Sequence, residues 1–170
     1  LICYPAGRNG AYTIPESVKS IYVYAFEDCI GLTSVIIPDS VEIIYAYAFS
    51  GCTNLTGVKL PDDLEEVPYA LFSGSTLLSE VVFGDNVVYV GEYAFANSTI
   101  DNVEVAAGAV YGEGVFFRST LTNITIGANA EFGLGSFQEC SYLTTVNMPQ
   151  ADVKFGRGCF AYAIQLANID

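Results

Sequence analysis

The side chains of this chain that can do chemistry are five cysteines, nineteen acids and six bases, and histidine is absent. Without histidine, a Ser-His-Asp triad, a Cys-His pair and a histidine-bound metal are all excluded. No phosphate-binding glycine loop and no H-E-x-x-H pair occurs, and the glycines of YGEGVF (111–116) fit a turn. The sequence therefore predicts a protein that is not an enzyme and that holds no cofactor.

An acidic cluster after a proline is the clearest candidate for a cation site. It consists of Asp62, Asp63, Glu65 and Glu66, next to Pro61. Calcium needs roughly six to eight oxygens that converge on one point, and this spacing does not specify such a cage. A solvated turn is the simpler interpretation, and we favour it and expect no metal site.

The charge of the chain excludes two classes of partner. Nineteen acids against six bases give a net charge of −13, and the Lys and Arg side chains are scattered along the sequence. Nucleic acids and anionic membrane surfaces attract clustered positive charge, so neither is expected as a partner. The apolar runs are much shorter than the roughly 18 residues of a spanning helix, so no membrane-spanning segment is expected.

The dominant feature of the sequence is an internal repeat. A phenylalanine recurs every 23 or 21 residues, at positions 26, 49, 72, 95, 116, 137 and 160. We call these the ladder phenylalanines. Apolar residues follow each of them at nearly constant distances, as Leu32, Val35 and Ile37 follow Phe26. A repeat of this length predicts a solenoid of about seven coils whose apolar sides are buried only when neighbouring coils stack.

The local pattern within one repeat predicts its structure. In LTGVKLP (55–61), Val58 and Leu60 alternate with Gly57 and Lys59, which is typical of a strand, and Pro61 ends it. A second extended piece follows, and the short segment Ala48-Phe49 predicts a tight helical turn before the next strand. We therefore predict an α/β solenoid with one domain (1–170), a lead-in (1–13) and coils at about 14–36, 37–59, 60–82, 83–104, 105–125, 126–147 and 148–170.

Four of the five cysteines fall on repeated positions. Three residues after each ladder phenylalanine stand Cys29, Cys52, Ser75, Ser98, Ser119, Cys140 and Ala163, and Cys159 directly precedes Phe160. Because cysteine alternates with serine and alanine there, small volume is the requirement, and buried free thiols are predicted. Disulfides between stacked coils remain an alternative, although the odd count argues against a disulfide framework. No zinc spacing is present.

The outward face of the predicted strands is the first candidate binding surface. One residue of each strand points away from the core, and these residues are Ile36, Lys59, Val82, Glu104, Thr125 and Asn147. A sheet face built from consecutive repeats offers a broad recognition surface, here of mixed chemistry. The alternative is a sheet face that is simply hydrated.

Tyrosine provides the second candidate. Tyr24, Tyr47 and Tyr93 each stand two residues before a ladder phenylalanine, and Tyr22 and Tyr45 stand four before it. Tyrosine rings suit both protein interfaces and stacking on sugars. We favour a simpler interpretation, in which the rings cover the edge of the coils and pack on one another.

These repeats resemble the BspA-like (treponemal-type) leucine-rich repeats. The resemblance lies in the strand motif LTSVIIP (32–38), in SVEIIYAYAF (40–49) and in GC (51–52), and it covers essentially the whole chain. It implies a right-handed leucine-rich-repeat array on an exported or surface-attached protein that mediates adhesion or host interaction, without catalytic residues. Three sequons, at Asn54, Asn97 and Asn123, matter only if the source is a eukaryote.

The leading hypothesis is an extracellular or cell-surface recognition module that binds a host or matrix protein. Its alternatives are a structural spacer in a longer surface protein and a carbohydrate-binding module. Residues 166–170 begin a strand of a further unit, and solenoids need a polar terminal cap. We therefore expect a fragment of a longer chain, or a last coil covered by another subunit.

Overall fold

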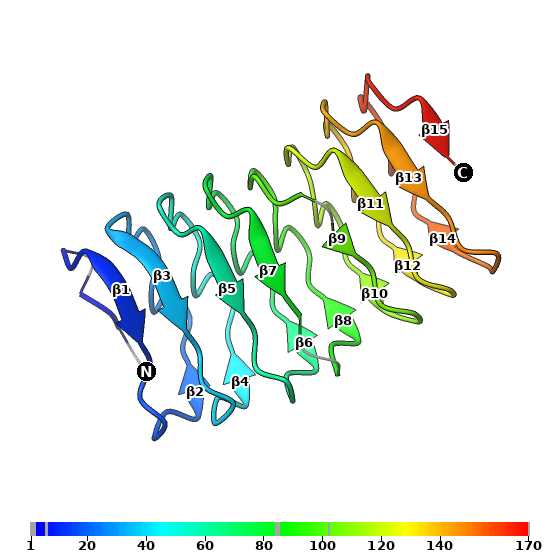
Figure 1. Cartoon of the computed structure of the whole chain (residues 1–170). Helices are drawn as coiled ribbons and strands as arrows, with labels where there is room; N and C mark the ends of the chain where they lie inside the picture. The colour runs from blue at the N-terminus through cyan, green and yellow to red at the C-terminus, as the bar shows by residue number, and fades with distance from the viewer. Residues whose placement is uncertain (1–2, 6, 84–85, 102, 170) are drawn as a thin grey trace.

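The computed structural model describes residues 3–5, 7–83, 86–101 and 103–169 and contains fifteen short β-strands. The chain winds into a β-solenoid of about seven coils, as predicted, with its two termini at opposite ends of the stack (Figure 1). Along the chain the strands alternate between two rows. One strand of each turn belongs to a front row, made of β1 (Gly10–Thr13), β3 (Leu32–Ile36), β5 (Gly57–Lys59), β7 (Glu80–Val82), β9 (Val103–Glu104), β11 (Asn123–Thr125), β13 (Thr145–Asn147) and β15 (Asn168–Ile169). The second belongs to a back row, made of β2 (Ser20–Ile21), β4 (Ile43–Ile44), β6 (Glu66–Val67), β8 (Tyr89–Val90), β10 (Val110–Tyr111), β12 (Glu131–Phe132) and β14 (Lys154–Phe155).

Strands of one row are parallel and pair with the strand one coil away. Val58 lies opposite Val81 in the front row, and Val90 lies opposite Tyr111 in the back row. In β5 the central Val58 is buried, whereas Lys59 beside it is exposed. The period-2 pattern of the sequence thus gives each front strand an inward apolar side chain and an outward one. Residue 170, at the end of the predicted last strand, lies outside the described residues.

The predicted helical turn at each ladder phenylalanine is wrong, and the α/β class with it, because the described residues contain no helix. In every coil the residue two before the ladder phenylalanine and the residue two after it have a φ between 49° and 74°. In the second coil these are Tyr47 and Gly51. A right-handed helix requires a negative φ at each residue, so the segment forms two successive tight turns instead.

The ladder phenylalanines form one continuous column of rings in the core. From Phe26 to Phe137 each ring is fully buried. Neighbouring rings are stacked, with centroids 4.7 Å apart for Phe26 and Phe49 and 5.8 Å apart for Phe95 and Phe116. The lead-in adds the first ring, since Tyr4 is buried and lies 5.0 Å from Phe26. The lead-in therefore covers the N-terminal end of the column.

The position three residues after each ladder phenylalanine holds a hydrogen-bond donor in most coils. The Cys52 thiol donates to the Phe26 carbonyl (3.0 Å), and the Ser75 hydroxyl donates to the Phe49 carbonyl (3.0 Å) in the next coil. Cys29, Cys52, Cys140 and Cys159 are free and buried, as predicted, whereas Cys3 is exposed. The sequence analysis explained this position by small volume alone. The structure adds that Cys52 and Ser75 also use it to donate a hydrogen bond to the preceding coil.

Neither row is continuous. Among the described residues the back row divides between β4 and β6, and the front row is interrupted between β3 and β5 and divides between β7 and β9, which pair with β5 and β11 respectively (Figure 1). Two front strands that do not form one regular sheet, β3 and β5, are still joined by the Thr56 N–H, which donates to the Thr33 carbonyl (3.2 Å). At each division the turn edge continues, because Phe49 donates its N–H to Leu71 (3.0 Å) and Phe95 donates to Val115 (2.9 Å), so the coils stay stacked.

Proline explains the division of the back row. The residue after each back strand donates its N–H to the preceding coil, as Tyr45 does to Ile21 (2.9 Å) and Gly91 does to Val67 (2.7 Å). Pro68 occupies this place in the third coil and has no N–H to donate. The bond to Ile44 cannot form, and β4 and β6 separate.

A change of coil length accompanies the division of the front row. The ladder spacing falls from 23 to 21 residues after Phe95, and Ile100 follows Phe95 one residue earlier than Leu78 follows Phe72. The turn that leads into β9 is thereby shortened. The back strands β8 and β10 still pair in register, so the change in coil length interrupts strand pairing in the front row and not in the back row at this point.

Candidate recognition surface

All six residues predicted for the outward strip of the front row are exposed: Ile36, Lys59, Val82, Glu104, Thr125 and Asn147. The structure does not bring them together as one surface. Lys59 lies beside Val82, and Glu104 lies beside Thr125, which in turn lies beside Asn147. The strip divides where β7 and β9 do not pair, into an N-terminal part with Ile36, Lys59 and Val82 and a C-terminal part with the other three. Within the N-terminal part Lys59 and Val82 lie on paired strands, whereas the strand of Ile36, β3, is joined to β5 through the bond from Thr56 to Thr33.

The two parts of the strip differ chemically. The N-terminal part exposes large apolar side chains, with Ile36 at 62% and Val82 at 45% exposure, on either side of a lysine that pairs with Asp62 (3.0 Å). In the C-terminal part the side chains are polar, and the Asn147 amide donates to the Thr125 hydroxyl (3.3 Å). Exposed apolar groups lose unfavourable hydration when a partner covers them, so the N-terminal part has more to gain from binding.

The tyrosines pack on one another along the turn edge of the coils. Tyr24 stacks on Tyr47 with centroids 5.1 Å apart, and Tyr22 stacks on Tyr45 at 5.4 Å. Tyr69, which the sequence pattern missed, continues the row by edge contacts to Tyr47 (5.2 Å) and Tyr93 (6.0 Å). Within each stacked pair one face of each ring is covered, and Tyr22 and Tyr24 are still 51% exposed.

Tyr93 is further held by an acid of the next coil. Its hydroxyl donates to the Glu113 carboxylate (2.6 Å), and this hydrogen bond, together with partial burial and the nearby negative charge, raises the pKa of Tyr93 to about 12. A tyrosine fixed in this way contributes to the contact between coils and is less free to engage a ligand.

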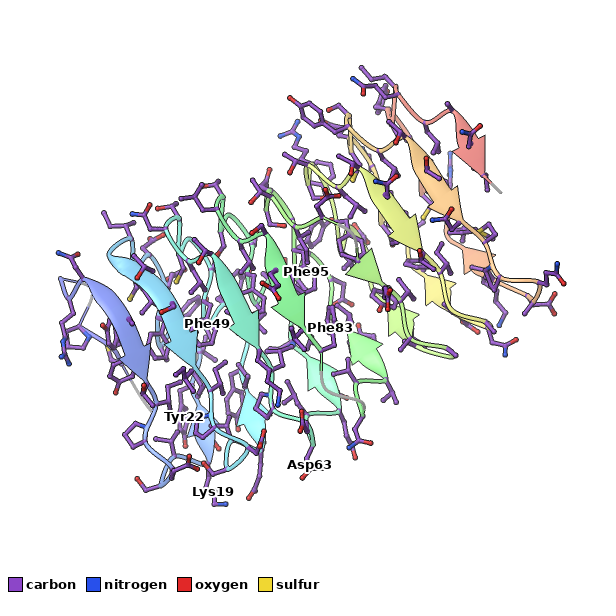
Figure 2. All side chains as sticks on the ribbon, viewed as in Figure 1. Lys19, Tyr22, Phe49, Asp63, Phe83 and Phe95 are labelled. Carbon is purple, nitrogen blue, oxygen red and sulfur yellow. The ribbon has the colours of Figure 1, made fainter. Side chains whose placement is uncertain are left out.

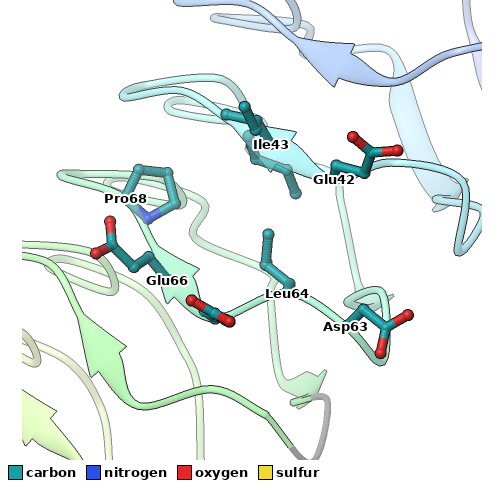
Figure 3. A pocket seen from close by; sticks show the side chains of 8 residues that line it. Glu42, Ile43, Asp63, Leu64, Glu66 and Pro68 are labelled. Atoms are coloured by element: carbon teal, nitrogen blue, oxygen red, sulfur yellow. The ribbon is translucent and has the colours of Figure 1, made fainter.

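Two hollows, which the sequence did not predict, lie at the two divisions. The back hollow, of about 340 Å³, lies between β4 and β6 and is lined by Ile43, Leu64 and Pro68, with Glu42, Asp63 and Glu66 at its rim (Figure 3). The front hollow, of about 720 Å³, lies between β7 and β9. Pro68 and the change in ladder spacing were the available signals, and neither was recognised as a break between strands.

The acidic cluster near the back hollow is a set of exposed carboxylates with individual partners. Asp62 pairs with Lys59, and the Asp63 carboxylate accepts a hydrogen bond from Asn86 (3.3 Å). Over the described part of the chain, no group of three or more acidic, cysteine or histidine side chains is placed to hold a metal ion. Of the three sequon asparagines, Asn54 and Asn97 are exposed and Asn123 is half-buried.

Comparison with known proteins identifies the family of this repeat. The family model for the BspA type leucine rich repeat region, in six copies, matches residues 9–111 and 109–170. The chain belongs to this family. The predicted resemblance is therefore confirmed, and the BspA-type repeat accounts for nearly all of the described structure. No curated protein matches the chain.

Solved structures of low identity share the BspA-type fold. The leucine rich repeat protein TpLRR of T. pallidum has a TM-score of 0.85 at 24% identity, over 95% of this chain and 80% of that one. The pneumococcal vaccine antigen PcpA has 0.62 at 20%, over 99% and 62%. A leucine rich cell surface protein of Faecalibacterium prausnitzii has 0.56 at 21%, over 95% and 60%. The chain thus spans less than two thirds of the latter two proteins.

The comparison and the structure agree on the coarse character of the BspA-type repeat. It is a stack of short parallel strands, and among the described residues no helix is long and apolar enough to cross a membrane. The outward strip and the two hollows are properties of this chain's own residues.

Proposed function

We propose that the chain is a non-catalytic recognition module of an extracellular or cell-surface protein, and that it binds a host or matrix protein through the front row. The observation that carries the proposal is the exposure of Ile36 and Val82 on either side of Lys59, on three neighbouring strands. The proposal of a surface location draws on the family and on the F. prausnitzii neighbour, which is described as a cell surface protein.

The chemistry of this patch favours a protein ligand. Apolar side chains around a single cation fit a partner surface that combines apolar side chains with a carboxylate. The chain as a whole carries a net charge of −13, and Lys59, which pairs with Asp62 (3.0 Å), is the cation within this patch.

The test is binding of the purified chain to arrays of matrix and host proteins, followed by a comparison of two variants. The front variant carries Ile36→Ser, Lys59→Ser and Val82→Thr. The control carries Ile43→Thr and Val110→Thr on the back row, where both side chains are also exposed. A loss of affinity of about tenfold or more in the front variant, with less than about twofold in the control, supports the proposal. Equal losses in both, or no ligand on the arrays, overturn it.

A structural spacer is the second candidate, and the continuous phenylalanine column favours it. A column of stacked rings from Tyr4 to Phe160 gives the chain a fixed length and direction. Under this proposal the chain holds two neighbouring parts of a longer surface protein apart and binds nothing itself. An array without ligands, combined with cooperative unfolding of the chain, would favour the spacer.

Carbohydrate binding receives less support from the tyrosines. Sugars stack on exposed ring faces, and the contact between Tyr24 and Tyr47 already covers one face of each ring. A glycan array tests this alternative directly. Binding of a glycan that is lost in Tyr24→Ala and Tyr47→Ala would establish it.

The last coil carries a further apolar surface. Tyr162, Ile164 and Ile169 are 72%, 78% and 56% exposed, and Phe160 is only half-buried. We propose that further chain or another subunit covers this end. Light scattering across a range of concentrations tests it: a monomer at all concentrations, with Phe160 equally solvent-accessible in a longer version of the chain, contradicts the proposal.

A further inference from the structure

The front hollow between β7 and β9 is the larger of the two hollows that separate facing strand edges. Its apolar lining includes Val81, Val82 and Phe83 from one side and Val103 and Val105 from the other. Phe83 is only half-buried, with its ring 5.7 Å from Phe95, whereas the residues at its place in four other coils are buried: Ile37, Leu60, Val105 and Ile126. Figure 2 shows Phe83 and Phe95 at the point where the front row divides.

The register of the neighbouring strands fixes which backbone groups face the hollow. Leu60 donates its N–H to Val82 (2.9 Å), and Val105 donates to Thr125 (2.9 Å), each from the last position of the strand segment toward the next coil. Phe83 occupies the same position, and its counterpart would be the Glu104 carbonyl. Among described residues no hydrogen bond joins β7 to β9.

In a parallel strand the N–H and C=O of one residue point to the same side, and successive residues alternate. Val81 and Phe83 therefore turn their backbone groups toward β9, and Glu104 turns its own toward β7. Among the described residues these groups have no hydrogen-bond partner across the hollow, so two strand edges face each other over its apolar lining. An extended chain lying between them would find donors and acceptors on both sides.

The back hollow differs in that its strand edge is less able to pair with an added strand. There, the edge of β6 ends in Pro68, which removes a donor, and the hollow is less than half as large (340 against 720 Å³). Prolines protect strand edges from pairing with other chains. The described edges of the front hollow carry no proline, since β7 and β9 read Glu-Val-Val and Val-Glu.

The negative charge at the front hollow favours a positively charged ligand segment. Of the described residues that line it, Glu80, Asp101 and Glu104 are acidic and none is Lys or Arg. Resting on the function proposed above, we propose that this hollow is a docking slot for an extended segment of the protein ligand, which adds a strand between β7 and β9. The segment has apolar side chains at alternate positions, which face the core, and lysine or arginine beside them, which face the acids at the rim.

Amide hydrogen exchange tests whether the edges are open. The Phe83 amide is expected to exchange at least about 100-fold faster than those of Leu60, Val105 and Ile126, which make the equivalent bonds. Equal protection of Phe83 and Leu60 would mean that β7 and β9 are paired in solution, and would overturn the proposal.

A synthetic peptide tests the slot itself. The probe is acetyl-Lys-Val-Thr-Val-Thr-Val-Lys-amide with a fluorescent label, measured by polarisation against the whole chain. Binding at roughly 100 µM is expected, together with slower exchange of the Phe83 amide in the complex. N-methylation of alternate backbone nitrogens should weaken it about tenfold, because the side chains stay and the donors go. No binding at millimolar peptide, or equal binding of the methylated peptide, overturns the proposal.

Matched variants place the peptide in the slot. Glu104→Pro removes an N–H that faces the hollow while leaving the groups that face β11, and it should weaken binding about tenfold. Glu104→Gln keeps the N–H and removes the charge, so a loss of about two- to threefold is expected. Asn147→Gln, two coils away, should bind as the unchanged chain does. If Glu104→Pro unfolds, the methylated peptide on the unchanged chain still decides.

The outcomes separate this proposal from the one it rests on. A ligand from the arrays that depends on Ile36, Lys59 and Val82 but is unaffected by Glu104→Pro and not displaced by the peptide overturns the slot alone. Arrays without any ligand, with the peptide still bound between β7 and β9, overturn the protein-ligand function and leave the slot.

Discussion

Apart from the ladder phenylalanines, the N-terminal coils place aromatic residues on the outer surface of the turn edge, whereas the C-terminal coils place them in the core. In the first two coils, tyrosines line the outside of the turn edge, and isoleucines stand inside, at Ile21 and Ile44. In the last three coils the inner place holds Tyr111, Phe132 and Phe155, which stack with centroids 4.9 and 5.4 Å apart.

Glycine takes over the outer positions where the aromatics move inward. Four residues before the ladder phenylalanine, Tyr22 and Tyr45 give way to Gly91, Gly112, Gly133 and Gly156. A Cβ built on Gly133 would lie 2.7 Å from the backbone carbon of Gly112. One fold thus closes its turn edge in two ways, by stacked tyrosines at one end and by close backbone contact at the other.

The largest expected effect separates inside from outside. Phe116→Ala should lower the free energy of unfolding by about 3–5 kcal/mol, because its ring is fully buried between the rings of Phe95 and Phe137. Tyr47→Ala should cost at most about 1.5 kcal/mol, because it loses ring contacts at a half-buried site. Urea unfolding of both variants measures the difference. Equal losses would mean that the tyrosine row supports the fold as strongly as the core does.

The next effect tests the close backbone contact. Gly133→Ala should destabilise the chain by about 1–3 kcal/mol, since its methyl group meets backbone rather than a side chain that can move. Tyr45→Ala changes the equivalent place in the second coil, where a Cβ is already accommodated, and should cost less. A neutral Gly133→Ala would contradict the proposed difference between the two ends.

Alkaline pH tests the buried thiols at the two ends. Burial raises the pKa of Cys52 to about 12 and that of Cys140 to about 11, from an ordinary 9.0. Above about pH 9 the unfolded chain loses these protons while the folded chain retains them, so stability present below pH 9 falls as pH rises. Each thiol contributes up to about 1.4 kcal/mol per pH unit in this window.

Serine variants isolate this contribution. Cys52→Ser keeps a donor where Ser75 already acts as one in the next coil. Urea midpoints from pH 8 to 11 should therefore fall less steeply for Cys52→Ser than for the unchanged chain, and the effect should continue to a higher pH than for Cys140→Ser. Parallel curves for all three proteins would show that these thiols do not titrate on unfolding.

The smallest effect concerns the strained tyrosines. Tyr24 has a φ of 61°, a conformation that costs a non-glycine residue about 1–2 kcal/mol. Tyr24→Gly relieves this cost and loses a stacked ring of similar value, so the net change should be within about 1 kcal/mol. A thermal melt is sufficient to measure it. A loss of more than about 2 kcal/mol would show that Tyr24 stabilises the first coil beyond its contact with Tyr47.

The spacing of apolar residues predicted what depends on burial. It identified the stacked coils, the phenylalanine column and the outward strip, because each follows from which side chains avoid water. It did not predict the turns, because Tyr24, Ala70, Arg118 and Glu139 occupy positive-φ positions where glycine would have been the signal.

The divisions of the two rows also escaped prediction, for a different reason. A break between strands depends on backbone groups that every residue carries, and only Pro68 announces one through its side chain. The front division coincides with the loss of one residue between Phe95 and Ile100, and a repeat pattern tolerates such a change in spacing without losing its apolar positions. The apolar repeat pattern therefore predicts the stacked coils but not the places where neighbouring strands fail to pair.

The offset of the two divisions has a mechanical consequence. Pulled along the axis of the stack, the coils would part first where a strand row is divided, next to Pro68 and between β7 and β9, while the turn-edge hydrogen bonds of Phe49 to Leu71 (3.0 Å) and Phe95 to Val115 (2.9 Å) hold them together. Because the divisions lie in opposite rows and two coils apart, extension at one would bend the stack in the opposite sense from extension at the other. Under tension the chain would lengthen by two small, opposed rotations, with the phenylalanine column as the common pivot.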